Sequence, residues 1–430
     1  MLKRVTAEHF RTVTRAEESA DPKVESAAAE IVADVRRNGD RALLAYTRKF
    51  DRVEAPDFRL EVSAEEIDAG AEEAGKKYAD VLRFFLNAAG NIRGFHERQL
   101  DRGFHFEKDG CSYGQLVRPI PKAGFYVPGG KAFYPSTFLM NVIPAKIAGV
   151  PEMAVTSPPD RQGRLNPLLL ALAKELGVTR LFKCGGAQAV AALAYGTETV
   201  PAVSKITGPG NAYVAAAKRL VMGTVGIDSI AGPSEVVIIA DKSANPEWIA
   251  ADLFAQAEHD GNNTAVLIAT SSGVFDAVES AIAKLLSSQP RREMIEQSLE
   301  KRSYAVVTEN LDEAFAVSDR IAPEHLQVML DLPDSEALSR VHNAGAIFLG
   351  TQTPVAVGDY YAGPNHVLPT AGTAVFSSPL GVYDFVKRTS FVRLTPEYMR
   401  EKGGEIASMA DFEGLHSHAL SARMRAAGKD

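Results

Sequence analysis

Two titratable side chains stand next to each other in the segment Ala322-Pro-Glu-His-Leu326. Glu324 and His325 fall between a predicted helix and a predicted strand, where Pro323 stiffens the chain. A histidine exchanges a proton near neutral pH, so a histidine beside a carboxylate is equipped for general acid–base catalysis. A helix-capping glutamate next to an incidental surface histidine is the alternative, and the segment alone favours the catalytic pair only slightly.

A second pair, Gln256 and His259, has the spacing of metal ligands. The two residues are three apart near the end of a predicted helix, so both side chains leave from one helical face. On its own such a pair is more often a solvated or capping arrangement than a metal site. Cys111 and Cys184 are the only cysteines, too few for a thiolate zinc site, so a bound metal must be held by nitrogen and oxygen.

Asp359 and His366 stand among glycines and prolines in the segment Val357–Thr370, which we expect to form a long polar loop after a buried strand. Functional side chains are often carried on loops that a rigid scaffold positions. His342 is expected on the polar face of a helix, as an ordinary surface residue.

Three glycine-containing turns follow predicted strands, at Tyr126–Gly130, Cys184–Val190 and Thr207–Tyr213. Glycines at such positions let backbone amides approach an anionic ligand at a helix N-terminus. None of the turns matches the G-x-G-x-x-G motif, and a tight turn with positive φ explains each one alone about as well. Three of them within one half of the chain favour a ligand.

The elements that must position these residues alternate between short apolar strands and helices. A first run of strands and helices begins at Gly124, and a second begins at Glu235–Ala240 and continues to Ala346–Leu349. This alternation predicts an α/β protein with two Rossmann-like, incomplete parallel-sheet domains.

Different patterns flank the two runs. Helical spacing extends over Asp21–Leu100 with a break at Asn38-Gly39, and Phe104–Ile120 alternates around Asp109-Gly110, which predicts a hairpin. The segment Glu397–Arg425 has helical spacing but too weak an apolar face to form its own core, so this tail is expected to dock elsewhere. We expect four regions: 1–117, a helical N-terminal segment and hairpin that packs with the second α/β domain; 118–234, the first α/β domain; 235–385, the second; and 386–430, an extended helical tail.

Length and composition exclude several classes of protein. The 430 residues, 46% of them hydrophobic, can fill more than one globular core. A net charge of -7 leaves no basic excess for a nucleic acid or an anionic membrane. The first residues lack the apolar core of a signal peptide, and no later stretch stays apolar for the roughly 20 residues that a bilayer requires. A cytoplasmic protein is expected.

Several motifs together resemble the histidinol dehydrogenase family over nearly the whole chain. The resemblance lies in Gly114–Val150, Gly185–Asp241, Gly358–Ser390 and the segments around Gln256 and His325. The stretches Gly-Ile-Asp-Ser-Ile-Ala-Gly-Pro-Ser-Glu235 and Gly-Pro-Asn-His-Val-Leu-Pro-Thr370 are too long and specific for a chance match.

The resemblance implies the zinc- and NAD-dependent oxidation of L-histidinol through histidinal to L-histidine, the last step of histidine biosynthesis, with two NAD molecules reduced. It also implies that Glu324 activates water, that His325 takes protons, and that a homodimer exchanges its tails so that active sites are shared. One zinc ion per subunit is implied, held by Gln256, His259, Asp359 and His418 in an octahedral site completed by substrate. Further substrate contacts are implied for Ser234, His325, His366 and Glu413, and NAD contacts for Tyr126, Gln188 and Asn211.

The sequence departs from the family pattern at Val375, where arginine is common, and at His416, which lies two residues before His418. The family spacing Glu-Gly-Leu-x-x-His selects His418. A related enzyme acting on another small alcohol, such as a sulfonated propanediol, remains an alternative. Glu413 suits a cationic amine, whereas a sulfonate favours arginine. A non-catalytic zinc-binding homologue is the other alternative, and the intact pair Glu324 and His325 argues against it.

Overall fold

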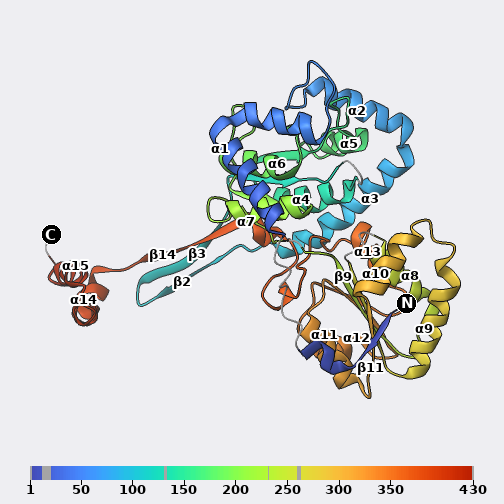
Figure 1. The fold of residues 1–430 in the computed structure, drawn as a ribbon. Coiled ribbons are helices and arrows are strands. Elements are labelled where there is room, and N and C mark those ends of the chain that lie inside the picture. The colour runs from blue at the N-terminus through green and yellow to red at the C-terminus, as the bar shows by residue number, and fades with distance from the viewer. Residues whose placement is uncertain (1, 12–20, 130–132, 231, 259–262, 429–430) are drawn as a thin grey trace. The chain divides into compact units, whose positions relative to one another are not determined.

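The computed structural model describes residues 2–11, 21–129, 133–230, 232–258 and 263–428. The chain divides into two compact units, one made of Met1–Gln99 with Pro121–Phe385 and the other of Leu100–Ile120 with Val386–Asp430. The first unit contains two sheets of parallel strands with helices between the strands (Figure 1). The predicted α/β fold class, with two parallel sheets and a helical tail, is therefore confirmed.

The first sheet has the strand order β6-β5-β4-β7-β8, and every neighbouring pair is parallel. Parallel neighbours require a crossover, and a helix provides most of these connections. The strands are β4 (Lys122–Tyr126), β5 (Glu152–Ser157), β6 (Leu181–Lys183), β7 (Lys205–Thr207) and β8 (Gly226–Ile227), and the helices are α4 (Pro135–Ala148), α5 (Pro167–Glu175), α6 (Gly186–Tyr195) and α7 (Ala212–Val221).

The second sheet has the order β1-β11-β10-β9-β12-β13, again parallel throughout. In β9 the side chains of Val236 and Ile238 join the core on one face, and those of Val237 and Ile239 join the core on the other. Apolar residues therefore follow one another along this strand because helices cover both faces. The strands are β1 (Lys3–Val5), β9 (Glu235–Ala240), β10 (Thr264–Ala269), β11 (Tyr304–Val307), β12 (His325–Met329) and β13 (Ala346–Leu349).

The helices of this second half are α8 (Pro246–Ala257), α9 (Ser272–Leu286), α10 (Arg292–Arg302), α11 (Leu311–Ile321), α12 (Asp334–Arg340) and α13 (Val355–Tyr360). Short 3-10 turns lie at η1 (Ala7–Arg11), η2 (Glu97–Gln99), η3 (Thr373–Val375) and η4 (Val382–Phe385). No helix in the described ranges is long and apolar enough to cross a membrane.

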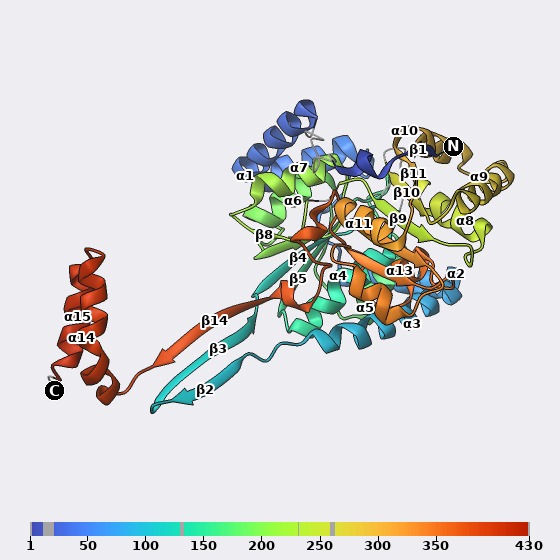
Figure 2. The ribbon, with the colours of Figure 1, turned by 90° about the horizontal axis from the view of Figure 1, so that it is seen from below.

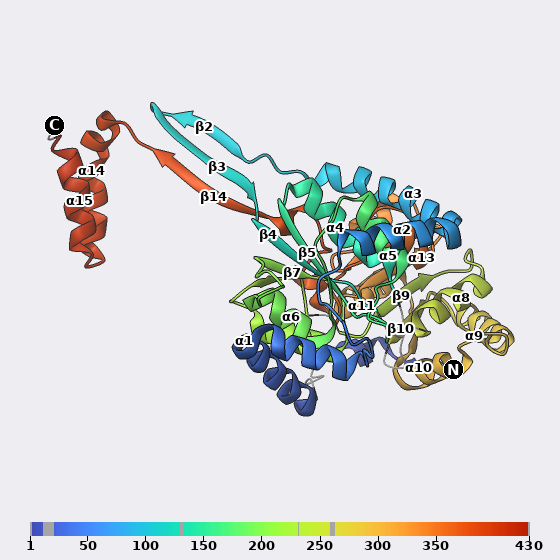
Figure 3. The same ribbon diagram turned by 90° about the horizontal axis from the view of Figure 1, so that it is seen from above.

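The N-terminal helices are α1 (Pro22–Phe50), α2 (Ala64–Lys77) and α3 (Ala79–His96), and α1 kinks at Gly39, the expected break. The expectation that this segment packs with the second α/β domain is wrong for α1 and α2, because α2 packs on α5 and α1 on α6 and α7, all in the first domain. The buried stripe of α1, which includes Val35 and Leu43, shares one core with α6 and α7 of the first sheet. Helix α1 lies along α6 (Figure 3). Strand β1 and the turn η1 do join the second half, where β1 pairs with β11.

The second unit is a three-stranded antiparallel sheet with a helical pair beyond the end of β14 (Figure 2). Its hairpin, β2 (Phe104–Lys108) and β3 (Cys111–Pro119), turns at Asp109 and Gly110, which both have positive φ as a type I′ turn requires. The hairpin was expected to group with residues 1–117. It belongs with the tail instead, because β14 (Val386–Arg393) pairs with β3 along its whole length.

The tail forms two helices, α14 (Pro396–Phe412) and α15 (His416–Ala426), separated at Gly414 with φ 77°. Their buried cluster consists of Ala407, Ala419 and Ala422. Large apolar side chains remain exposed on the same helices, and Phe412 is 93% exposed.

Candidate active site

The three glycine turns lie at the carboxyl ends of β4, β6 and β7, which share one edge of the first sheet because the strands are parallel. The amide of Gly186 donates to the hydroxyl of Tyr126 at 3.3 Å, and an added Cβ at Gly186 would lie 2.7 Å from Oε1 of Gln188. An added Cβ at Gly208, whose φ is 118°, would lie 2.1 Å from the carbonyl oxygen of Tyr126. The structure thus brings Tyr126, Gln188 and the third glycine turn together.

Asn211 caps the N-terminus of α7. Its side-chain oxygen accepts from the amides of Tyr213 at 3.0 Å and Val214 at 3.2 Å. Capping accounts for asparagine at this position on structural grounds, and it also fixes the side chain at the end of the third glycine turn.

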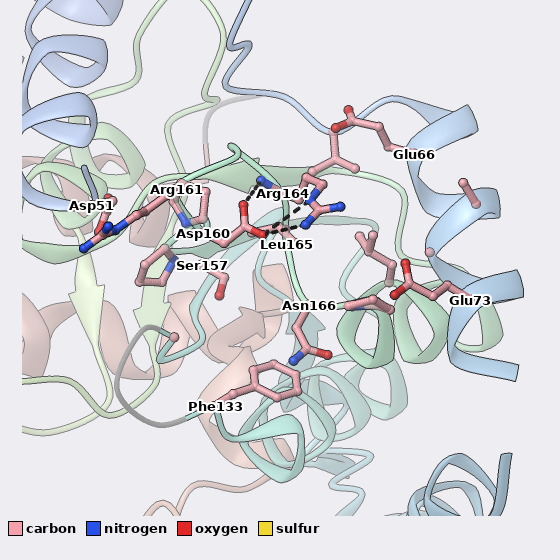
Figure 4. Close-up of a pocket in the computed structure, with 18 of the residues that line it drawn as sticks. Asp51, Glu66, Glu73, Phe133, Ser157, Asp160, Arg161, Arg164, Leu165 and Asn166 are labelled. Carbon is pink, nitrogen blue, oxygen red and sulfur yellow. Dashed lines mark hydrogen bonds and ion pairs between the residues drawn. The ribbon is translucent and has the colours of Figure 1, made fainter. Parts of the chain in front are cut away.

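A pocket of about 780 Å³ lies beside these turns (Figure 4). Gly129 and Ser157, from the ends of β4 and β5, line it together with charged groups from α2 and the loop 158–166. An added Cβ at Gly185 would lie 2.5 Å from Cγ of Pro158, so the pocket wall packs directly on the turn that begins α6. The volume falls in the range of sites for small molecules and cofactors.

Glu324 and His325 join α11 to β12, as expected, and both side chains are buried, with 6% and 5% of their surface exposed. Burial rules out the incidental surface histidine. The backbone of Glu235 on the neighbouring strand holds both residues. Its amide donates to Oε2 of Glu324 at 3.0 Å, and its carbonyl lies 3.0 Å from Nδ1 of His325.

The proton on Nδ1 of His325 is therefore donated to a carbonyl, and Nε2 becomes the nitrogen that exchanges protons. Nε2 is buried without a hydrogen-bond partner in the described part of the chain. Burial lowers the pKa of His325, but the charges of Glu324 and Asp359 outweigh burial and raise that pKa to about 9. Burial has the opposite effect on a carboxyl group, and it raises the pKa of Glu324.

Asp359 and His366 lie against this pair. Oδ1 of Asp359 is 3.7 Å from Nε2 of His325, which is long for a hydrogen bond. Nδ1 of His366 donates to the backbone carbonyl of Asp359 at 2.8 Å. Asp359 was expected in a loop, but it lies in the last turn of helix α13, and the polar loop begins only after Tyr360.

The remaining predicted ligands fall in three places. Gln256 lies in the last turn of α8 with 5% of its surface exposed, and its side-chain Nε2 is buried without a partner among the described residues. His259 lies outside the described residues. Glu413 and His418 belong to the second unit, at the end of α14 and in the first turn of α15.

The unpartnered side-chain amide of Gln256 is compatible with a metal held by nitrogen and oxygen. Either atom of the amide, Oε1 or Nε2, can be turned toward the ion. Within the described ranges no three His, Cys, Asp or Glu side chains form a metal-binding group. Ser234 stands just before β9, and its side chain lowers the pKa of Glu324 against the larger effect of burial.

The motifs did not single out two residues that contact the site. Glu235 bonds to Glu324 and His325 through its backbone, and Asn365 precedes His366 and is bonded to helix α4. Burial and the nearby Glu324 raise the pKa of Glu235 to about 7. A carboxylate at the start of an otherwise apolar strand was the available signal. His342 was placed wrongly: it follows α12 rather than lying on it, and it bonds to Asp319 at 2.8 Å.

Comparison with known proteins identifies the family of the chain. The sequence model described as histidinol dehydrogenase matches residues 13–426. Histidinol dehydrogenase of Chlorobium chlorochromatii is 50% identical over 95% of this chain and 94% of that protein. The Chromobacterium violaceum enzyme of the same name is 50% identical, covering 97% and 96%.

A solved structure has a similar fold over nearly the whole chain. The crystal structure of histidinol dehydrogenase from Elizabethkingia anophelis has a TM-score of 0.92 and 33% identity, covering 99% of this chain and 98% of that one. The protein is an oxidoreductase of the α/β class. The chain belongs to the histidinol dehydrogenase family, as its motifs predicted.

Proposed function

We propose that this enzyme oxidises L-histidinol through histidinal to L-histidine, reduces two NAD molecules, and requires one zinc ion per subunit. One observation carries the proposal most directly. The acid–base pair Glu324 and His325 is buried beside Asp359 and His366 in a chain half identical to proteins named histidinol dehydrogenase. In this proposal the reaction belongs to histidine biosynthesis in the cytoplasm, and no nucleic acid or membrane takes part.

Four residues would hold the zinc ion, namely Gln256, His259, Asp359 and His418. The bound ion would supply a fixed, redox-inert Lewis acid that orients the substrate. The buried, unpartnered amide of Gln256 supports this assignment, because an unpaired polar group in the interior is costly unless something binds it.

His325 acts as the base that takes the alcohol proton in the first oxidation and the hydrate proton in the second. This role needs the neutral imidazole, and the charge of a bound zinc ion would offset the carboxylate charges that raise the pKa of His325. Its Nδ1 is occupied by the carbonyl of Glu235, so Nε2 faces the reaction. Glu324 activates the water that adds to histidinal. Keeping the reactive aldehyde bound between the two oxidations prevents its loss.

In this proposal NAD would bind at the three glycine turns, with contacts from Tyr126, Gln188 and Asn211. The hydrogen bond from Gly186 to Tyr126 and the close approach of Gly208 to Tyr126 support a shared site there, and the adjacent pocket offers room for part of a dinucleotide. Ser234, His366 and Glu413 would contact histidinol, with the carboxylate of Glu413 facing the cationic amine.

The enzyme would work as a homodimer whose active sites are shared. Glu413 and His418 lie in a unit whose helices bury only small alanine side chains and expose Met409, Phe412 and Met424. A second copy of the chain would cover this surface and receive the two residues into its own site.

Purified enzyme supplied with zinc, NAD and histidinol should form two NADH for each histidinol consumed, measured by NADH absorbance and by chromatography of the product. A sulfonated propanediol should give none. Turnover of the sulfonate but not of histidinol would replace the proposal with the first alternative, and zinc binding without NADH formation from either substrate would replace it with the second.

A further inference from the structure

Helix α4 contains a proline at a position where the helix is buried on all sides. Every residue from Pro135 to Ala145 is buried, and Pro144 lies within that stretch. Proline has no backbone N–H, so the carbonyl of Met140, four residues earlier, loses its helical donor. A buried carbonyl without a partner is costly, so the donor must come from elsewhere.

The side chain of Asn365 supplies that donor. Its Nδ2 donates to the carbonyl of Met140 at 2.7 Å. The same nitrogen lies 3.4 Å from Nε2 of His96, whose Nδ1 donates to the carbonyl of Ile92 at 2.8 Å. Oδ1 of Asn365 accepts from the amide of Val367 at 2.9 Å. With 4% of its surface exposed, Asn365 is fully bonded inside the protein.

The next residue is His366, and α4 holds it as well. Nε2 of His366 lies 3.3 Å from Oγ1 of Thr137, one helical turn before Met140. The start of the same loop is tied to α3, where Nδ2 of Asn91 donates to the carbonyl of Tyr361 at 2.8 Å. An added Cβ at Gly363 would lie 2.7 Å from the carbonyl oxygen of Asn91, so this contact is tight.

We propose that Pro144 and Asn365 are positioning residues of the active site: the carbonyl freed by Pro144 anchors Asn365, and this anchor fixes His366 and, through it, Asp359. The bond from Nδ1 of His366 to the carbonyl of Asp359 carries the constraint to the end of α13. The inference rests on the proposed function for its catalytic meaning. The anchor itself is a property of the fold and can be measured without turnover.

The first test is Asn365→Ala in the full-length protein, prepared both without metal and with zinc. Hydrogen exchange of the segment 357–367 should become roughly tenfold faster in both preparations. Zinc should be lost to a chelator about 10–100 times more readily, as for other residues that orient metal ligands, and kcat should fall more than KM rises.

Ser271→Ala is the matched control. Ser271 caps α9 by accepting from the amide of Val274 at 3.4 Å, so its loss destabilises the fold without touching the anchored loop. Exchange in the segment 357–367 and zinc retention should stay as in the wild type. Equal acceleration in this control would show that general destabilisation, and not the anchor, controls the loop.

Pro144→Ala keeps the proposal testable if Asn365→Ala folds poorly. The new N–H competes with Asn365 for Met140, so exchange of 357–367 should rise and kcat should fall although the helix gains a hydrogen bond. Combined with Asn365→Ala it should add no further effect, because both changes act on one bond. Unchanged exchange in either single variant, or additive effects in the double variant, would overturn the inference. Because exchange needs no substrate, a wild type inactive on histidinol would refute only the proposed function.

Discussion

Three titratable side chains, those of Glu235, Glu324 and His325, meet where β9 and β12 begin. The backbone of Glu235 bonds to Glu324 and His325, while its own side chain is largely buried, with Oε2 unpartnered in the described part of the chain. The parallel register pairs His325 with Val236, so the backbone groups of Glu235 fall opposite the catalytic pair. The strand pairing therefore positions the base.

Glu324→Gln should slow the second oxidation more than the first, because only the second step needs an activated water. A loss of roughly 10²–10⁴-fold is expected for histidinal, as for other general bases, and a smaller loss for the first hydride transfer. Histidinol and histidinal should be supplied separately, with His325→Asn as the variant that damages both steps. Equal losses on the two substrates would rule out this division of roles.

Zinc binding should not depend on the two cysteine thiols. A chelator should abolish activity and added zinc should restore it, since the proposed ligands are nitrogen and oxygen. The double variant Cys111→Ser, Cys184→Ser should still bind about one zinc per chain, measured by metal analysis. Both cysteines are buried, so their replacement can lower the stability of the fold. Each single variant therefore serves as a control for this loss of stability. Zinc lost only in the double variant would contradict the ligand set.

Asp51 should make stability depend on pH. Burial raises its pKa from 3.8 to about 6, and Oδ2 has no partner among the described residues. The folded state therefore prefers the protonated carboxyl, and stability falls as pH rises through the window from 3.8 to about 6. Asp51→Asn should be neutral near the lower end of this window and stabilising above its upper end.

The gain has an upper limit of about 3 kcal/mol, and partial exposure of the carboxyl reduces it. Thermal unfolding across this pH range measures the effect, with the exposed Asp57→Asn as the control. A gain that did not depend on pH would point to packing rather than ionisation.

At the scale of elements, a buried ion pair supports the third glycine turn. Lys218 on α7 donates to the carbonyl of Gly208 at 2.9 Å and pairs with Asp228, and Asp228 accepts from the amide of Gly208 at 2.8 Å. Both side chains are almost fully buried. The two charges thus hold both backbone groups of a glycine that approaches Tyr126.

Lys218→Met should destabilise the protein by about 3–5 kcal/mol, because it leaves Asp228 charged and unpaired in the interior. Urea unfolding measures the loss, and Lys218→Met with Asp228→Asn should recover part of it. Lys76→Met breaks an exposed pair with Glu72 and should leave the unfolding midpoint unchanged. A loss no larger than in this control would mean that the pair does not support the turn.

The sequence predicted elements well where one residue pattern decides them. Residues 235–240, 264–269 and 346–349 form strands with the expected bounds, because apolar runs bounded by polar turns have few other solutions. Helix α13 was missed because six residues containing Gly358 and Asp359 have little helical signal. Strand β1 was missed because its three residues pair with β11, about 300 positions away, a contact that no local pattern contains.

For the candidate site too, local motifs predicted the residues but not the long-range contacts that bury them. Motifs pointed to Glu324, His325, Asp359 and His366, and the structure brings these four together. Burial of the pair depends on β9 lying beside β12, which the local sequence does not contain. The partners of α1 were mispredicted for a related reason, since periodicity identifies a buried face without naming what covers it.

At the scale of the whole molecule, the second unit leaves large apolar side chains exposed. Its sheet exposes Phe104, Phe106 and Val392, its helices expose Phe412, and its buried cluster is three alanines. Monomeric proteins rarely leave so much apolar surface to water. A symmetric dimer in which each tail completes the partner's site would bury this surface and place His418 near zinc.

Coexpression of His325→Asn with His418→Asn tests the exchange. Each variant alone should be inactive, because one lacks the base and the other lacks a metal ligand. In a mixed dimer with exchanged tails, one site carries both lesions and the other joins an intact body to an intact tail. Random pairing makes about half of the dimers mixed, each with one intact site of two, so activity should return to roughly a quarter of wild type. If each tail completes its own chain's site, every site keeps one lesion. A sample shown by differential tags to contain mixed dimers, yet no more active than either parent, would contradict the exchange.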